Sequence, residues 1–203
     1  MRERAEPGVS RPADAGPFAP FCQEPDGTVR VGPPLPAAVL SGSFNPLHHG
    51  HTGLAAAAER HLGVPVHFEV SVTNADKPEL PPDEVARRLA QFVGVAPVWV
   101  TRAPTFEQKA DLFPGTAFVL GYDTAVRLID PKYYGGDPGR RDAALRKLLA
   151  SGCRVVVGGR LDPAGAFRTW DGGDVAAEFA GLFVPLTEAD FRADVSSTTL
   201  RGK

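Results

Sequence analysis

The feature that most constrains this chain is a strand, a turn and a helix that follow one another between residues 37 and 62. Residues 37–40 form a short apolar run that predicts a buried strand. Gly42 and Pro46 then break this run with turn chemistry. From His49 onward, apolar residues recur every four positions, which is typical of one buried helix face. In a parallel α/β sheet, phosphate groups bind at such a junction between a strand's carboxyl end and a helix N-terminus.

The turn itself carries residues suited to a polyphosphate. Gly42 and Ser43 allow the backbone to come close to a ligand. His48 and His51 are three residues apart, so at a helix start they share a face and can meet one anion together. Gly50 lies between them and has no side chain to obstruct that approach. Because the positive end of a helix opposes a cation, this pair favours an anion over a metal ion.

Two motifs in the chain resemble those of a known family. The stretch Gly42-Ser43-Phe44-Asn45-Pro46-Leu47-His48-His49-Gly50-His51 resembles the G-x-F-x-P-x-H-x-G-H motif of the nucleotidylyltransferase superfamily. Its opening is most similar to that of the nicotinamide and nicotinate mononucleotide adenylyltransferases. Near the other end, Val195-Ser196-Ser197-Thr198-Thr199-Leu200-Arg201 resembles I-S-S-T-x-I-R, the second signature of the adenylyl-transferring members. Two such motifs in this order are a specific signal, whereas H-x-G-H alone would be a weak one.

The resemblance implies a set of site residues. It makes His48 and His51 the catalytic residues, which bind the nucleotide's phosphates and stabilise charge during transfer. It assigns acceptor binding to Lys77 and Arg160, with a solvated loop lysine as the alternative for Lys77. The ATP-binding residues come from the two motifs and from a G-x-D after the fourth expected strand. They are Gly42, Ser43, Phe44, Asn45, Gly50, Gly121, Asp123, Ser196, Ser197, Thr198 and Arg201.

Four of these residues also have a physical reading of their own. Ser197 and Thr198 are of the types that cap helix N-termini, where backbone N–H groups point at an anion. Arg201 would add a forked donor for phosphate oxygens. A carboxylate at Asp123 can accept hydrogen bonds from ribose hydroxyls, and its alternative role is a helix N-cap.

The implied function is the transfer of AMP from ATP to a phosphate-bearing acceptor, with release of pyrophosphate. The resemblance names nicotinamide or nicotinate mononucleotide as the acceptor, which would place the chain in NAD biosynthesis. Mg²⁺ is expected as a cofactor bound through the nucleotide's phosphates, with no metal ligands from the protein. Two alternatives stay open. One is hydrolysis of ATP or another nucleotide, and the other is a non-catalytic nucleotide-binding module.

Aromatic residues near the G-x-D motif leave the acceptor open. Relatives that use pyridine nucleotides often stack the ring on a tryptophan after this motif. This chain has Tyr133 and Tyr134 in that region instead. Its two tryptophans are Trp99, expected in a core strand, and Trp170, expected in a later loop.

The order of predicted elements indicates one Rossmann-like α/β domain. Apolar, β-branched runs alternate with helical patterns, which predicts a parallel sheet covered by helices on both faces. Strands are expected at 37–40, 65–72, 98–101, 116–120, 153–157 and 182–186. Helices are expected from 49 onward, over 85–92, 105–112 and 124–129, around 145–149 and over 175–181.

Composition sets the remaining expectations. Residues 1–36 hold 8 of the 20 prolines and are interpreted as an irregular N-terminal arm, with one short strand near 28–31, ahead of a nucleotidylyltransferase-like domain over 37–203. The net charge of −2 gives no indication of nucleic-acid binding, and the resemblance implies small-molecule nucleotide substrates. No apolar run approaches the ~20 residues that span a membrane, and no signal-peptide pattern is present. Cys22 and Cys153 form no metal or redox pattern, so a cytoplasmic setting is expected. The oligomeric state is open, with a homo-oligomer among the options.

Overall fold

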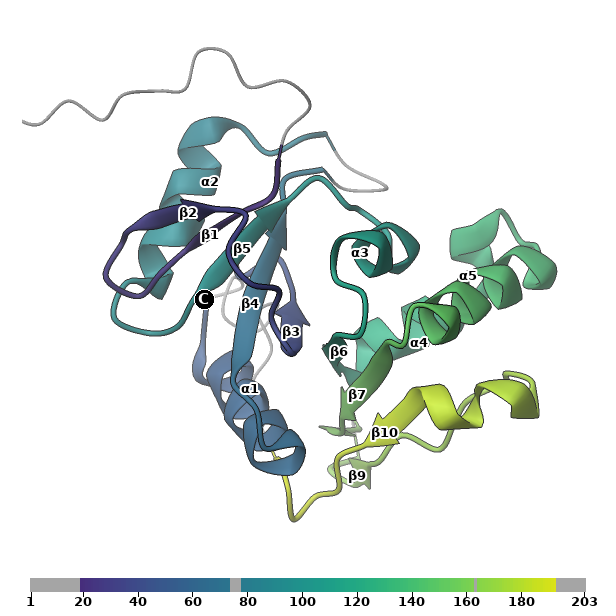
Figure 1. Ribbon diagram of the computed structural model, residues 1–203. Helices are drawn as coiled ribbons and strands as arrows, with labels where there is room; N and C mark the ends of the chain where they lie inside the picture. Colours follow the sequence, from purple (N-terminus) through teal and green to yellow (C-terminus); the bar gives the residue numbers. More distant parts are fainter. Residues whose placement is uncertain (1–18, 74–77, 163, 193–203) are drawn as a thin grey trace, which may run out of the picture.

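The computed structural model describes residues 19–73, 78–162 and 164–192 (Figure 1). Its centre is one eight-stranded sheet with the strand order β10-β7-β6-β3-β4-β5-β1-β2. These strands are β1 (Phe21–Gln23), β2 (Val29–Val31), β3 (Ala38–Ser41), β4 (Val66–Ser71), β5 (Val98–Thr101), β6 (Ala117–Gly121), β7 (Arg154–Gly158) and β10 (Phe183–Pro185). The six strands predicted from the apolar runs are all present.

The six predicted strands are parallel to one another. Numbered in chain order, they lie in the sequence 3-2-1-4-5-6, which is the doubly wound order of Rossmann-like sheets. The prediction of a Rossmann-like parallel sheet is therefore confirmed. The direction in which strands are added reverses between β3 and β6, and open α/β sheets bind ligands at the carboxyl ends of such a pair.

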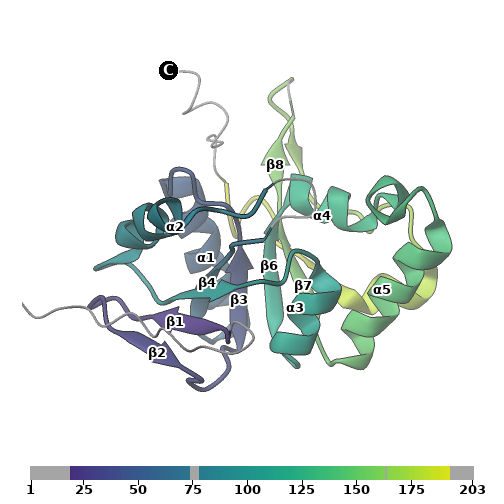
Figure 2. The same cartoon turned by 90° about the horizontal axis from the view of Figure 1, so that it is seen from above.

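Helices cover both faces of the sheet, as Figure 2 shows. The α-helices are α1 (His49–Leu62), α2 (Pro82–Leu89), α3 (Phe106–Leu112), α4 (Tyr122–Ile129) and α5 (Pro138–Ala150). The 3₁₀ helices are η1 (Ala90–Phe92), η2 (Pro131–Tyr134) and η3 (Ala177–Leu182). One apolar cluster joins α1, α2 and η1 to one face, and a second joins α3, α4, α5 and η3 to the other. The segment predicted as a helix over 175–181 is thus a 3₁₀ helix.

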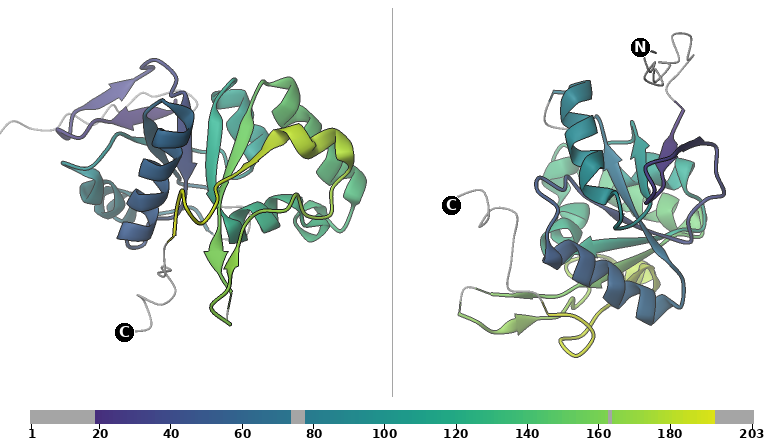
Figure 3. Two further views of the ribbon diagram at one scale, coloured as in Figure 1. Left: turned by 90° about the horizontal axis from the view of Figure 1, so that it is seen from below. Right: turned by 90° about the vertical axis from the view of Figure 1, so that its left-hand side faces the viewer.

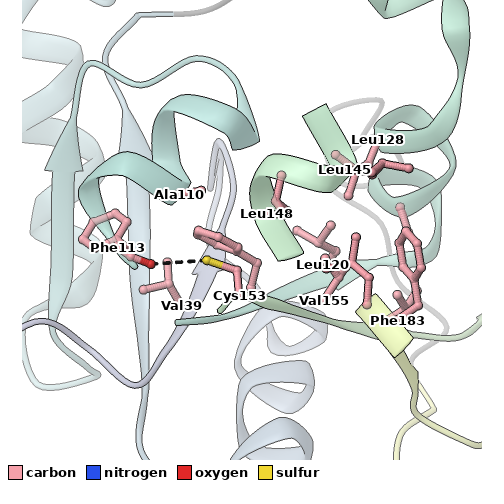
Figure 4. Packing of buried hydrophobic residues seen from close by; sticks show 14 of the residues in the cluster. Val39, Ala110, Phe113, Leu120, Leu128, Leu145, Leu148, Cys153, Val155 and Phe183 are labelled. Atoms are coloured by element: carbon pink, nitrogen blue, oxygen red, sulfur yellow. Dashed lines mark hydrogen bonds between the residues drawn. The ribbon is translucent and has the colours of Figure 1, made fainter. Parts of the chain in front are cut away.

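Alternation along the strands produces these two clusters. In β3, Val39 belongs to the α3–α5 side, whereas Ala38 and Leu40 belong to the α1–α2 side. Figure 4 shows the α3–α5 side, where the thiol of Cys153 donates to the Phe113 carbonyl at 3.5 Å. Burial raises the pKa of this thiol above its ordinary value. Cys153 therefore serves as a small apolar core residue.

The helix α1 packs very closely on the end of β7. A Cβ on Gly158 would lie 2.5 Å from Leu54 Cδ1, so a larger residue at this position would require the Leu54 side chain to shift. Leu54 and Ala58 are buried on the helix face that the spacing of four predicted. This packing places Leu54, near the start of α1, against the carboxyl end of β7.

Two hairpins differ from the sequence expectations. The segment interpreted as irregular contributes β1 and β2, of which only the strand near 28–31 was expected, and β1 pairs antiparallel with β5. Strands of three residues are too short to show a periodic pattern. A second hairpin, β8 (Arg160–Leu161) with β9 (Phe167–Arg168), projects from the sheet and is visible in Figure 3. Among the described residues, no helix combines the length and apolarity needed to cross a membrane.

Candidate functional site

The candidate site lies where β3 ends and α1 begins. His48 is the N-cap of α1, and the first turn of this helix contains no acidic residue. The positive end of the helix is therefore not neutralised from within, which favours an anionic ligand. β6 lies beside β3 and runs parallel to it, so Asp123, just past the end of β6, lies at the same edge of the sheet. This is the edge at which the topology reverses.

The rings of His48 and His51 are stacked against each other. Their centroids are 3.7 Å apart and their planes are inclined by 23°. The backbone N–H of Gly50 donates to His48 Nδ1 at 3.1 Å, and the backbone N–H of His48 donates to His51 Nδ1 at 3.3 Å. Because both Nδ1 atoms accept, each neutral ring carries its proton on Nε2. The sequence prediction that these two histidines share a helix face is confirmed.

Burial keeps the two imidazoles uncharged at neutral pH. The pKa of His51 is lowered to about 4, first by burial and then by the neighbouring charge of His48. The pKa of His48 is also lowered, by burial and by His49. The pair therefore supplies two neutral N–H donors at a helix N-terminus. Such donors can stabilise developing negative charge.

The buried ring of Phe44 packs against the histidine pair. Its side chain is fully buried, its ring meets that of His51 edge-on at a centroid distance of 5.0 Å, and its φ is +43°. A Cβ on Gly42 would lie 2.8 Å from the Phe44 ring, so glycine is required there by packing. The resemblance assigned both residues to ATP binding. In this structure Phe44 is fully buried, its carbonyl accepts from Gln91, and its ring packs against His51.

Ser43 and Asn45 are held from α2, a contact that the sequence did not predict. Arg88 Nη1 donates to the Ser43 carbonyl at 2.9 Å, and Arg87 Nη2 donates to Asn45 Oδ1 at 2.7 Å. Hydrogen bonds from Arg87 and Arg88 lower the pKa of Glu84 to about 2. The spacing Glu84-x-x-Arg87-Arg88 indicates ion pairs within the helix, but no feature of the sequence shows that the helix reaches this turn.

Gly121, Asp123 and Arg160 come together at the end of β6. Gly121 is the N-cap of α4 and makes no side-chain cap bond, so the alternative role of Asp123 as the N-cap is wrong. Asp123 forms an ion pair with Arg160, whose guanidinium lies 5.7 Å from the centroid of the Tyr122 ring. The side chain of Asp123 is 66% exposed. The ribose and acceptor residues implied by the resemblance are thus direct neighbours.

Five predicted site residues lie outside the described part of the chain. They are Lys77, Ser196, Ser197, Thr198 and Arg201. Their assignment to acceptor and phosphate binding stays a prediction.

The tryptophans and tyrosines singled out in the sequence fall into two groups. Trp99 is buried in β5, as expected, and Trp170 is buried as well, where its ring meets those of Tyr122 and Phe183. Trp170 was expected in a loop, and the sequence did not indicate that its side chain is buried. Tyr133 and Tyr134 line a hollow of about 450 Å³ beside α3 and α5. The other residues that line it are Glu107, Gly135, Arg140 and Ala143.

The side chains that could bind a metal ion can be compared with the expected magnesium ion. Across residues 19–73, 78–162 and 164–192, no group of three or more His, Cys, Asp or Glu side chains could hold a metal ion. Mg²⁺ keeps several waters and commonly binds through substrate phosphates, so the expected magnesium ion does not depend on such a group.

Comparison with known proteins finds one similar protein whose name indicates an enzymatic activity. No family model matches the chain. A protein of Schizosaccharomyces pombe (strain 972 / ATCC 24843), named "Putative nicotinamide mononucleotide adenylyltransferase", is 32% identical over 114 residues. The match covers 49% of this chain and 44% of the relative, so the chain spans less than half of that protein's length. The chain is thus similar to part of a protein that is named as an adenylyltransferase.

Proposed function

We propose that this protein transfers AMP from ATP to an acceptor that carries a phosphate group. The observation that carries this proposal is the stacked pair of His48 and His51 at the N-terminus of α1. The pair supplies two Nε2–H donors at the edge of a doubly wound sheet where its topology reverses. The name of the S. pombe relative supports the same reaction class.

The chemistry needs no covalent intermediate with the protein. A phosphate oxygen of the acceptor attacks the α-phosphorus of ATP and forms a new P–O bond. The bond between the α-phosphorus and the bridging oxygen breaks, and pyrophosphate leaves with the electron pair. Such a reaction depends on positioning and on stabilisation of charge. His48 and His51 would donate to the phosphates that become pyrophosphate, where negative charge increases.

The other site residues complete the proposal. Asp123 would accept hydrogen bonds from the ribose, for which its exposed carboxylate lies at the correct edge of the sheet. Arg160 would exchange its ion pair with Asp123 for the acceptor's phosphate. Ser197, Thr198 and Arg201 would contact the β- and γ-phosphates, and Lys77 the acceptor. Mg²⁺, when bound through the phosphates, would neutralise part of their charge.

The proposed acceptor is nicotinamide or nicotinate mononucleotide. The relative's name and the resemblance of the first motif both favour a pyridine mononucleotide. ATP is the proposed donor in preference to CTP, because the Ser-Ser-Thr-x-x-Arg ending resembles adenylyl-transferring members.

A product analysis tests the proposal. The protein is incubated with Mg²⁺ and ATP or CTP, together with nicotinamide mononucleotide, nicotinate mononucleotide or another phosphomonoester. Nicotinamide riboside, which lacks the phosphate, is the matched control. The expected result is pyrophosphate together with a dinucleotide, formed from ATP and a mononucleotide only. Release of ADP or AMP without any acceptor would instead identify a hydrolase, and ATP binding without turnover would identify a binding module.

A further inference from the structure

The turn that leads to the histidine pair is held by a side chain from another element. Gln91, in η1, donates from Nε2 to the Phe44 carbonyl at 3.0 Å and accepts the Leu47 N–H at Oε1 at 2.8 Å. A closed β-turn over Phe44–Leu47 would pair these same two backbone groups directly. The amide of Gln91 bridges them instead.

The position of Gln91 is itself fixed. Its Nε2 also donates to the Arg88 carbonyl one helical turn earlier, at 3.2 Å. Arg88 is buried and donates to the Ser43 carbonyl at 2.9 Å. Arg88 and Gln91 therefore hold the carbonyls of Ser43 and Phe44 and the N–H of Leu47 from one side.

The neighbouring residues connect this contact to His51. Phe92, which follows Gln91, is fully buried and meets the Phe44 ring edge-on at 5.3 Å. The Phe44 ring in turn meets His51 at 5.0 Å. Leu47 directly precedes His48, the N-cap whose backbone N–H donates to His51. Both members of the pair thus depend on backbone positions that η1 holds.

We infer that Gln91 is a positioning residue for His48 and His51. Its amide spans the turn, sets the backbone of Phe44 and Leu47, and so fixes where the two Nε2–H donors point. As a contribution to catalysis, this inference rests on the proposed adenylyl transfer. As a statement about the position of the histidines, it can be tested without any turnover.

The test compares Gln91→Met with wild type. Methionine has a similar length but neither donates to the Phe44 carbonyl nor accepts strongly from the Leu47 N–H. The matched control is Gln23→Met, because Gln23 is a buried glutamine that donates to the Leu89 carbonyl of α2 at 2.9 Å. That contact joins the same helical segment to β1 and leaves the turn untouched.

Three quantities are measured at a temperature where all three proteins are folded. These are kcat with ATP and mononucleotide, the Kd of ATP by calorimetry, and the pKa of His51 by NMR without substrate. In Gln91→Met we expect kcat to fall by about tenfold to a hundredfold, since small misplacements of this kind have such effects. We expect the Kd of ATP to change less than kcat, and the pKa of His51 to rise from about 4 toward 6.5 as its ring loses burial. Gln23→Met should change none of the three.

The outcomes separate the inference from the proposed function. If wild type transfers no AMP, the proposed function fails, and the NMR titration of His51 still decides whether Gln91 positions it. An unchanged His51 pKa in Gln91→Met overturns the inference. Equal losses of kcat in Gln91→Met and Gln23→Met also overturn it, because they would reflect general loosening of the helix.

Discussion

Lys109 Nζ lies 2.7 Å from each carboxylate oxygen of Glu69, and both side chains are buried. Thr101 Oγ1 donates to the same carboxylate at 2.6 Å. The pair joins α3 to β4, and the Glu69 carbonyl accepts from the Gly42 N–H at 3.0 Å. A buried and satisfied ion pair thus lies next to the first residue of the candidate site.

Removal of one partner of this pair should be costly. Lys109→Met would leave the Glu69 carboxylate buried without its cation, and losses of this kind are about 3–5 kcal/mol in the free energy of unfolding. The double variant Glu69→Gln with Lys109→Met should recover much of that loss, because no charge stays buried. Urea denaturation of wild type, Lys109→Met, the double variant and a control variant measures both effects. Lys147→Met, which breaks an exposed pair with Asp111, is the control and should change stability far less.

His51→Ala should lower kcat strongly while the affinity for ATP falls only modestly. A preorganised donor to developing charge typically contributes about 10²–10³ to kcat. His51→Asn should recover part of the loss, because asparagine keeps an N–H donor at this position. Steady-state kinetics and calorimetry with ATP separate the two quantities. A variant with a raised KM and a normal kcat would show that the contact is made equally in the ground state.

The buried histidine should also make stability depend on pH. His51 titrates near 6.5 when unfolded and near 4 when folded, so between these values the unfolded state binds more protons. Stability is therefore greatest above pH 6.5 and falls as the pH is lowered toward 4. The lowered pKa values of His48 and His67 act in the same direction. Thermal unfolding between pH 7 and pH 5 should show a shallower decline for His51→Asn than for wild type, and identical slopes would contradict this account.

Lys77→Ala tests the acceptor assignment. If the lysine contacts the acceptor's phosphate, the KM of the acceptor should rise more than the Kd of ATP, because only the acceptor loses a charged contact. Kinetics with varied mononucleotide and calorimetry with ATP give the two values. Lys132→Ala, on an exposed lysine beside Tyr133, serves as the control. An unchanged acceptor KM would make Lys77 an ordinary solvated loop lysine.

The sequence was sufficient for the parallel sheet and for the position of the histidine pair. Both rest on local signals, namely apolar runs such as 98–101 and the spacing of His48 and His51. Contacts between distant elements were not predictable in the same way. The bridge from Gln91 to Phe44 and Leu47 spans more than forty residues of chain, and Gln91 resembles any polar residue on a helix. The buried state of Arg88 was missed for the same reason, because charge alone suggests an exposed side chain.

Phe44 shows how a motif can hide two kinds of role. It belongs to the first signature, so the resemblance placed it with the ATP-binding residues. The structure shows a fully buried ring between His51, Phe68 and Phe92. A motif records which residues occur together, and it does not separate those that touch a ligand from those that hold the others in place.

The antiparallel hairpin of β1 and β2 has a practical consequence for shortened versions of this protein. A truncation at residue 37, where the proline-rich stretch ends, would remove the partner of β5 and the bond from Gln23 to α2. The strand Val98–Thr101 would then become an uncovered apolar edge, which is a template for aggregation between chains. A truncated protein that is to stay monodisperse therefore has to begin before Phe21.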